Sequence, residues 1–142
     1  MRAQVRATTR RISRHIRKAI AVAKNWAKLT AALSAKVAPE KLQFVTWGSV
    51  MFNSTPKRGG QNDVLIAVGN ECIYLYRKGL MGEFFDKVAR TNIEGAEEGV
   101  AELGLGQRSP SLSLNTRSQG QWILMPSEPE AIEQLVRHLA QN

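Results

Sequence analysis

The sequence predicts an α+β fold, in which a small antiparallel β-barrel or sandwich is capped by a C-terminal helix and preceded by a long N-terminal helix. Two observations support this prediction. Apolar residues recur at helical spacing at both ends of the chain, and between these ends apolar and polar residues alternate with a period of two. Short antiparallel strands must close or stack to hide their edges, which favours a barrel or sandwich. We therefore expect a basic amphipathic helix over residues 1–38 and a β domain over residues 39–142.

The N-terminal segment has the pattern of one long helix with an apolar stripe. The stripe residues follow one another at alternating spacings of four and three, which keeps them on one side of a helix: Val5, Thr9, Ile12, Ile16, Ala19, Ala23, Trp26, Thr30, Leu33 and Val37. We expect the helix to end before Pro39, because the residue that precedes a proline is biased away from helical geometry.

Positive charge is concentrated in this predicted helix. The chain has 20 basic and 12 acidic residues and a net charge of +8. Residues 1–36 contain no acidic residue and ten basic ones, which are Arg2, Arg6, Arg10, Arg11, Arg14, Arg17, Lys18, Lys24, Lys28 and Lys36. The rest of the chain therefore has ten basic and twelve acidic residues, a net charge of −2. Any partner that is attracted by positive charge should meet the helix first.

The central part of the chain has the two-residue period of β-strands. Strand-forming residues fill "KLQFVTWGSVMF" (41–52), which we expect to bend at Gly48, and a cluster of turn formers makes residues 53–63 a loop. "VLIAV" and "CIYLY" flank residues 69–71 and predict a β-hairpin. The second strand of this hairpin should alternate, with Ile73 and Leu75 on one face and Cys72, Tyr74 and Tyr76 on the other.

Further strands are predicted toward the C-terminus. "GLMGEFF" (79–85) reads as a connection, and "KVARTNIEGAEE" (87–98) favours a strand that ends near Gly95. "VAELGLG" (100–106) is compatible with a short strand or with a turn of helix. "SLSLNTRS" and "QWILMPS" predict a second hairpin across residues 119–120.

The chain is expected to close with an amphipathic helix. Ser127 and Glu130 have the spacing of a capping box, and Pro129 stands in the first turn, where proline is tolerated. Apolar residues then recur at helical spacing. These signals predict a helix over residues 128–141.

Three stretches together resemble bacterial pleckstrin-homology-like and GRAM-like domains. They are "DVLIAVGNECIYLYRKG" (63–79), "FDKVARTNIEGAEEG" (85–99) and "SLSLNTRSQGQWILMPSEPEAIEQLVRHLAQ" (111–141). The resemblance covers about residues 42–141 and rests on the order and texture of the elements, without an invariant motif. It implies a binding module that is not an enzyme, with lipid headgroups, peptides or partner proteins as ligands.

The sequence departs from the lipid-binding members of that family. In those members, basic residues of the first loop and of the following strand hold phosphates. Lys57 and Arg58 stand in the matching loop, where they form a secondary candidate contact, but the next strand begins with Asp63 and supplies no basic residue. The tryptophan common in the last helix of the family is also missing from residues 128–141. These departures argue against specific phosphoinositide binding.

The sequence gives little support to catalysis. His15 and His138 lie in different predicted helices and lack the spacing of a metal-binding pair. Cys72 is the sole cysteine, which precludes an intramolecular disulfide, and we expect it to pack as a small apolar residue. A run of acidic residues is typical of solvated strand ends and turns: Glu94, Glu97, Glu98 and Glu102. We therefore expect no enzyme activity, no cofactor and no metal.

Three interpretations of the basic helix remain open. In the first, its stripe packs on the β domain, or on a second copy in a homodimer, and the basic face is merely solvated. In the second, the helix lies in the plane of a membrane with its cations toward anionic lipid. In the third, the cations contact the phosphates of a nucleic acid, and a dimer is again an option.

We expect a non-enzymatic binding or adaptor module that uses the helix to bind an anionic surface at the inner face of a membrane, or a partner protein. The residues expected at the contact are Arg6, Arg10, Arg14, Arg17, Lys24 and Lys28, with Trp26 as the interfacial anchor. Nucleic-acid binding through the same helix is the alternative. No stretch approaches the roughly 18 uncharged apolar residues of a membrane-spanning helix. With the single cysteine, this favours a cytoplasmic protein that is peripheral on the inner membrane face.

Overall fold

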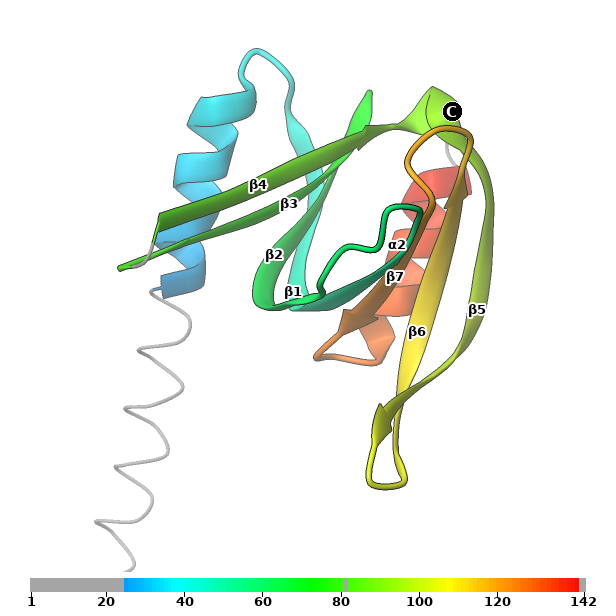
Figure 1. Ribbon diagram of the computed structural model, residues 1–142. Helices are drawn as coiled ribbons and strands as arrows, with labels where there is room; N and C mark the ends of the chain where they lie inside the picture. Colours follow the sequence, from blue (N-terminus) through cyan, green and yellow to red (C-terminus); the bar gives the residue numbers. More distant parts are fainter. Residues whose placement is uncertain (1–24, 81, 141–142) are drawn as a thin grey trace, which may run out of the picture.

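Seven antiparallel strands form one sheet in the order β4-β3-β2-β1-β7-β6-β5 (Figure 1). The computed structural model describes residues 25–80 and 82–140. The strands are β1 (Leu42–Asn53), β2 (Gln61–Gly69), β3 (Cys72–Gly79), β4 (Gly82–Ala89), β5 (Ile93–Gly104), β6 (Gln107–Thr116) and β7 (Gln121–Pro126). A helix over residues 25–37 precedes the sheet, the 3-10 helix η1 (Arg90–Asn92) joins β4 to β5, and α2 (Glu130–Ala140) follows β7.

Strand β1 joins the two halves of the sheet. Residues up to Gly48 pair mainly with β2, whereas residues from Gly48 onward pair with β7, where Phe52 lies opposite Trp122. A Cβ atom on Gly48 would lie 2.2 Å from the carbonyl oxygen of Met125, so only glycine lets the two backbones approach this closely. The change of partner at Gly48 agrees with the bend predicted there.

The main hydrophobic core lies between the inner face of the sheet and α2. It takes every second residue of the strands, including the fully buried Ile73, Leu75 and Trp122. Helix α2 contributes Ile132 and Leu135 from one face. This core therefore uses the alternation that the sequence predicts for β3.

A second core lies on the outer face of the β1–β4 half of the sheet. It contains Tyr74 and Tyr76 of β3, whose side chains point away from the main core, together with the half-buried Cys72. The helix over residues 25–37 covers this face and contributes the buried Leu29 and Leu33. One helix thus packs on each face of the sheet (Figure 1).

Both predicted hairpins and the C-terminal helix are confirmed. β2 and β3 pair with Val68 opposite Ile73, and β6 and β7 pair with Asn115 opposite Gln121. Helix α2 begins at Glu130, two residues later than predicted. Of the long N-terminal helix, the part over residues 25–37 is present, and residues 1–24 lie outside the described chain.

The predicted closure into a barrel or sandwich is wrong, because the sheet is open. Within the described residues, β4 pairs only with β3 and β5 pairs only with β6, so these two strands are the edges. Charge protects the β5 edge in place of a strand partner, since this strand itself carries the four glutamates that were expected at strand ends and turns: Glu94, Glu97, Glu98 and Glu102.

The strand predicted over residues 87–98 is also wrong. The chain already turns at Gly82, whose φ of +122° suits glycine, and Gly79 pairs with Gly82 so that β4 starts within the predicted connection. β4 then ends at Ala89, where η1 breaks the strand and the backbone N–H of Arg90 donates to the carbonyl of Glu71. β5 continues through Gly95 as far as Gly104 and therefore includes most of residues 100–106.

Candidate functional site

The helix over residues 25–37 is attached to the sheet by the last part of its apolar stripe. The ring of Trp26 stacks on Trp47 of β1, with ring centroids 5.1 Å apart and 27° between the planes. Leu29 and Leu33 are buried one and two turns further along. The part of the predicted stripe that is described thus packs on the protein's own sheet, and the ring of Trp26 contributes to that attachment.

A polar cluster fixes the side of the helix that faces β4. The ammonium of Lys36 lies 2.8 Å from Oε1 of Glu83 and 4.9 Å from the centre of the Phe85 ring. The hydroxyl of Tyr76 donates to Oε2 of Glu83 over 3.0 Å. These contacts with Lys36 and Tyr76 lower the pKa of Glu83, and the hydrogen bond to Glu83 raises the pKa of Lys36. The ion pair therefore persists at neutral pH.

Glu40 fixes the chain between the helix and β1. Its Oε1 accepts the backbone N–H groups of Glu71 and Cys72, and its Oε2 accepts the hydroxyl of Tyr74. Burial and the Glu40 hydrogen bond raise the pKa of Tyr74, so the phenol stays protonated. The helix and the β2–β3 turn are therefore linked to each other through one carboxylate.

The positive charge predicted to bind an anionic surface lies ahead of this attached helix. Residues 1–24 contain eight basic residues and no acidic one, so residues 25–142 contain twelve of each and have no net charge. Of the predicted contact residues, Arg6, Arg10, Arg14, Arg17 and Lys24 lie outside the described residues. Lys28 is described and is exposed on the helix.

Lys57 and Arg58, the secondary contact predicted in the β1–β2 loop, have different surroundings in the structure. Arg58 forms an ion pair with Asp86 of β4 over 2.8 Å, and its guanidinium carbon lies 3.9 Å from the centre of the Phe52 ring. Lys57 is exposed. Arg58 therefore holds the loop against β4, and of the two residues only Lys57 presents its charge mainly to solvent.

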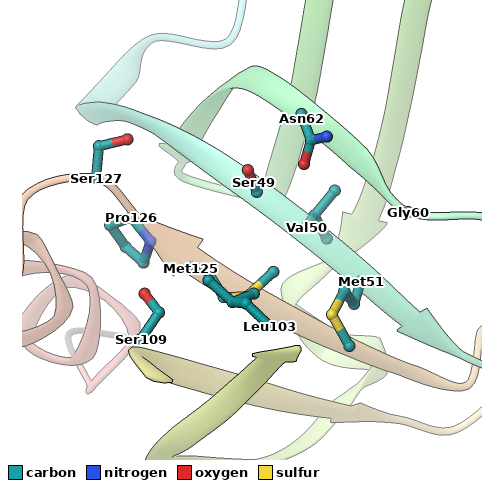
Figure 2. A pocket seen from close by; sticks show the side chains of 10 residues that line it. All are labelled: Ser49, Val50, Met51, Gly60, Asn62, Leu103, Ser109, Met125, Pro126 and Ser127. Carbon is teal, nitrogen blue, oxygen red and sulfur yellow. The ribbon is translucent and has the colours of Figure 1, made fainter. Parts of the chain in front are cut away.

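A pocket of about 540 Å³ opens where β1, β7 and the β5–β6 hairpin meet (Figure 2). The residues that line it are Ser49, Val50, Met51, Gly60, Asn62, Leu103, Ser109, Met125, Pro126 and Ser127. None of them is charged. The lining combines thioether and aliphatic carbon with hydroxyl and amide groups, so its chemistry suits an uncharged, partly apolar group and not a phosphate.

Strand register brings this pocket together from residues that are distant in sequence. Ser49 of β1 lies directly opposite Met125 of β7. Leu103 lies two residues after Ala101, which is opposite Ser109. Figure 2 shows Met51, Leu103 and Met125 extending toward one another from β1, the hairpin and β7. Sequence reasoning missed the pocket because a hairpin pairing does not reveal which outer faces become neighbours. The one available signal was the apolar Met51 and Leu103 at positions facing solvent.

The pocket lies next to the start of the attached helix. The backbone N–H of Ser127, at the rim of the pocket, donates to the carbonyl of Trp47 over 2.9 Å. The ring of Trp47 is the surface on which Trp26 stacks, and Ser49 follows two residues later. Trp47 therefore connects the rim of the uncharged pocket to Trp26, near the start of the described helix.

The described residues contain no group of three or more histidine, cysteine, aspartate or glutamate side chains arranged to hold a metal ion. His138 stacks on Phe44 with ring centroids 5.4 Å apart, and His15 lies outside the described chain. No helix in residues 25–80 or 82–140 is long and apolar enough to cross a bilayer.

The chain matches no protein-family model, and a search of curated proteins found no similar sequence. The seven-stranded antiparallel sheet with its C-terminal helix is compatible with a pleckstrin-homology-like fold but does not identify one. The structure defines an α+β protein with one open antiparallel sheet. The features that bear on its function are the positive charge of residues 1–24 and the uncharged pocket.

Proposed function

We propose that this protein is a non-enzymatic, pleckstrin-homology-like binding or adaptor module that its basic N-terminal segment recruits to the anionic inner face of a membrane. One observation carries the proposal. The whole net charge of +8 lies in residues 1–24, directly before a helix that is fixed to the sheet by Trp26, Leu29 and Leu33.

Electrostatics supports an anionic surface as the target. A basic residue near such a surface gains about 1 kcal/mol, so eight of them in one segment supply a substantial attraction that salt weakens. Residues 25–142 have no net charge, so the net attraction comes from the basic segment. Because the helix over residues 25–37 is packed on the sheet, recruitment of the segment also brings the sheet and its pocket to the surface.

Vesicle sedimentation tests the proposal. The full-length protein should pellet with vesicles of equimolar phosphatidylglycerol and phosphatidylcholine, and should stay in solution with phosphatidylcholine alone. The triple variant Arg10→Glu, Arg14→Glu and Arg17→Glu should lose this binding. A matched control reverses the same number of charges on exposed residues elsewhere, through Lys41→Glu, Lys87→Glu and Arg137→Glu, and should retain most of it.

Two results would overturn the proposal. Equal losses in the two triple variants would show that only overall charge matters. A protein that ignores anionic vesicles but shifts duplex DNA, with an affinity that falls steeply as salt rises, would instead be a nucleic-acid-binding protein.

A further inference from the structure

Exposed large apolar side chains of the described chain are concentrated in β1 and the β5–β6 hairpin. Five large hydrophobic residues are exposed in that part of the chain, and four of them belong to the pocket or to the β5–β6 hairpin: Met51, Val100, Leu103 and Leu105. The fifth, Leu80, lies in the turn between β3 and β4. Single exposed leucines are ordinary on protein surfaces, whereas a cluster of this kind marks an interaction surface.

The turn between β5 and β6 holds its leucine in an unfavourable conformation. Leu105 has a φ of +50° between Gly104 at +90° and Gly106 at +74°, and its side chain is fully exposed. Glycine or asparagine would fit the left-handed conformation better, and packing inside the protein gives no reason for leucine. A leucine in this position therefore indicates a contact outside the chain.

We call the pocket lining together with Leu105 of the hairpin turn the apolar end. Leu103 lines the pocket and lies two residues before Leu105. Met51 and Met125 extend the same surface across β1 and β7, and Ser49, Ser109 and Ser127 supply hydroxyl groups (Figure 2). The uncharged pocket lining of carbon, sulfur and hydroxyl suits the boundary between lipid headgroups and acyl chains, and the exposed Glu102 and Arg108 beside the turn pair with each other over 3.9 Å.

We propose that the apolar end inserts into the acyl region of the anionic bilayer to which residues 1–24 are recruited. This inference rests on the proposed function and adds a second contact to it. The occupant follows from position, because Trp47 contacts both Ser127 at the pocket rim and Trp26 near the start of the attached helix, which the eight basic residues directly precede in sequence. A polybasic segment alone binds reversibly, and a second apolar contact gives stable attachment.

Fluorescence from the hairpin turn tests insertion directly. In a Cys72→Ala background, Leu105→Cys would carry a nitrobenzoxadiazole label, and Ser118→Cys in the β6–β7 turn would carry the same label at the opposite end of β6. With vesicles of equimolar phosphatidylglycerol and phosphatidylcholine, the label at position 105 should shift to the blue and brighten. The label at position 118 should not change.

Binding measurements with the full chain give the second readout. The double variant Leu103→Ser and Leu105→Ser should lower the apparent affinity for the same vesicles by about tenfold or more, because leucine side chains leave an apolar environment. Leu80→Ser removes a leucine that is as exposed as Leu105 from the turn between β3 and β4, at the opposite edge of the sheet. This variant should leave the affinity unchanged.

The outcomes separate this inference from the proposed function. Vesicle binding that persists in the double variant, without a spectral shift at position 105, overturns the insertion and leaves recruitment by the basic segment standing. Absence of vesicle binding by the wild-type protein overturns both. A wild-type dimer that the double variant converts to a monomer, with no change in vesicle binding, would assign the apolar end to self-association and would also overturn insertion.

Discussion

Gly48 is the residue on which the two halves of the sheet depend. Its missing side chain lets β1 pass within contact of the Met125 carbonyl at the point where β1 changes partner from β2 to β7. The sequence suggested a bend there because a glycine interrupts a strand pattern. It did not reveal that the reason is a close backbone approach, since that depends on a strand much later in the chain.

Replacing Gly48 should therefore destabilise the fold. We expect Gly48→Ala to lower the free energy of unfolding by about 1–3 kcal/mol, because the new Cβ overlaps the backbone of β7. Urea unfolding monitored by circular dichroism measures the change. Gly99→Ala is the control, since a Cβ there makes only an ordinary 3.7 Å contact with Ser111 Oγ. Similar losses in both variants would contradict the role given to Gly48.

The Lys36–Glu83 pair predicts a pH-dependent contribution to stability. The pKa of Glu83 is lowered in the folded protein, so ionised Glu83 stabilises the fold above the ordinary glutamate pKa of about 4.3, and this is lost as the pH falls through the lowered value. Glu83→Gln should thus lower the melting temperature at neutral pH, and the difference from wild type should shrink in acid. Glu128→Gln, on an exposed loop, is the control. A melting-temperature difference between wild type and Glu83→Gln that grew in acid would contradict stabilisation by ionised Glu83.

At the scale of elements, the helix over residues 25–37 is part of the folded unit. Leu33 has no exposed surface and packs among the outer-face side chains of β2 and β3. Leu33→Ala should lower the free energy of unfolding by about 2–5 kcal/mol and make the helix more accessible to protease. Ser34→Ala, at an exposed position of the same helix, should lower neither the stability nor the protease resistance. Wild-type protease resistance in the Leu33 variant would show that the helix is held by other contacts.

The elements that could be predicted from the sequence are those defined by local signals. Alternation and a short turn suffice for the β2–β3 and β6–β7 hairpins, and a capping signal with a helical stripe suffices for α2. The β4–β5 junction could not be predicted, because η1 forms where the backbone N–H of Arg90 donates to the carbonyl of Glu71, in the turn before β3. The pocket depends on the register of strands β1, β5, β6 and β7, which no single stretch of sequence encodes.

At the scale of the whole molecule, charge and folded core are separated along the chain. The buried residues of the helix begin at Leu29, whereas the net positive charge lies in residues 1–24. A chain truncated to residues 25–142 should therefore keep an unfolding free energy close to that of the full chain and lose binding to anionic vesicles. Urea unfolding and vesicle sedimentation measure the two properties. Truncation that also removed stability, or that left vesicle binding intact, would contradict this separation.

The openness of the sheet is the whole-molecule property that the sequence argument missed. Closure was expected because unpaired strand edges are hazardous, yet this chain protects β5 with glutamates and covers one outer face with a helix. Side-chain charge and a covering helix are alternatives to closure. A strand pattern alone does not distinguish among them, because all three begin from the same alternation.

The stacked pair Trp26 and Trp47 gives the protein an internal optical probe. The chain has three tryptophans, and the third, Trp122, is fully buried in the main core. Two indoles with centroids 5.1 Å apart couple their electronic transitions, so their circular dichroism and emission depend on whether the helix rests on the sheet. Separation of the helix from the sheet can therefore be followed in the unlabelled protein, on a membrane or in solution, by the circular dichroism and emission of the Trp26–Trp47 pair.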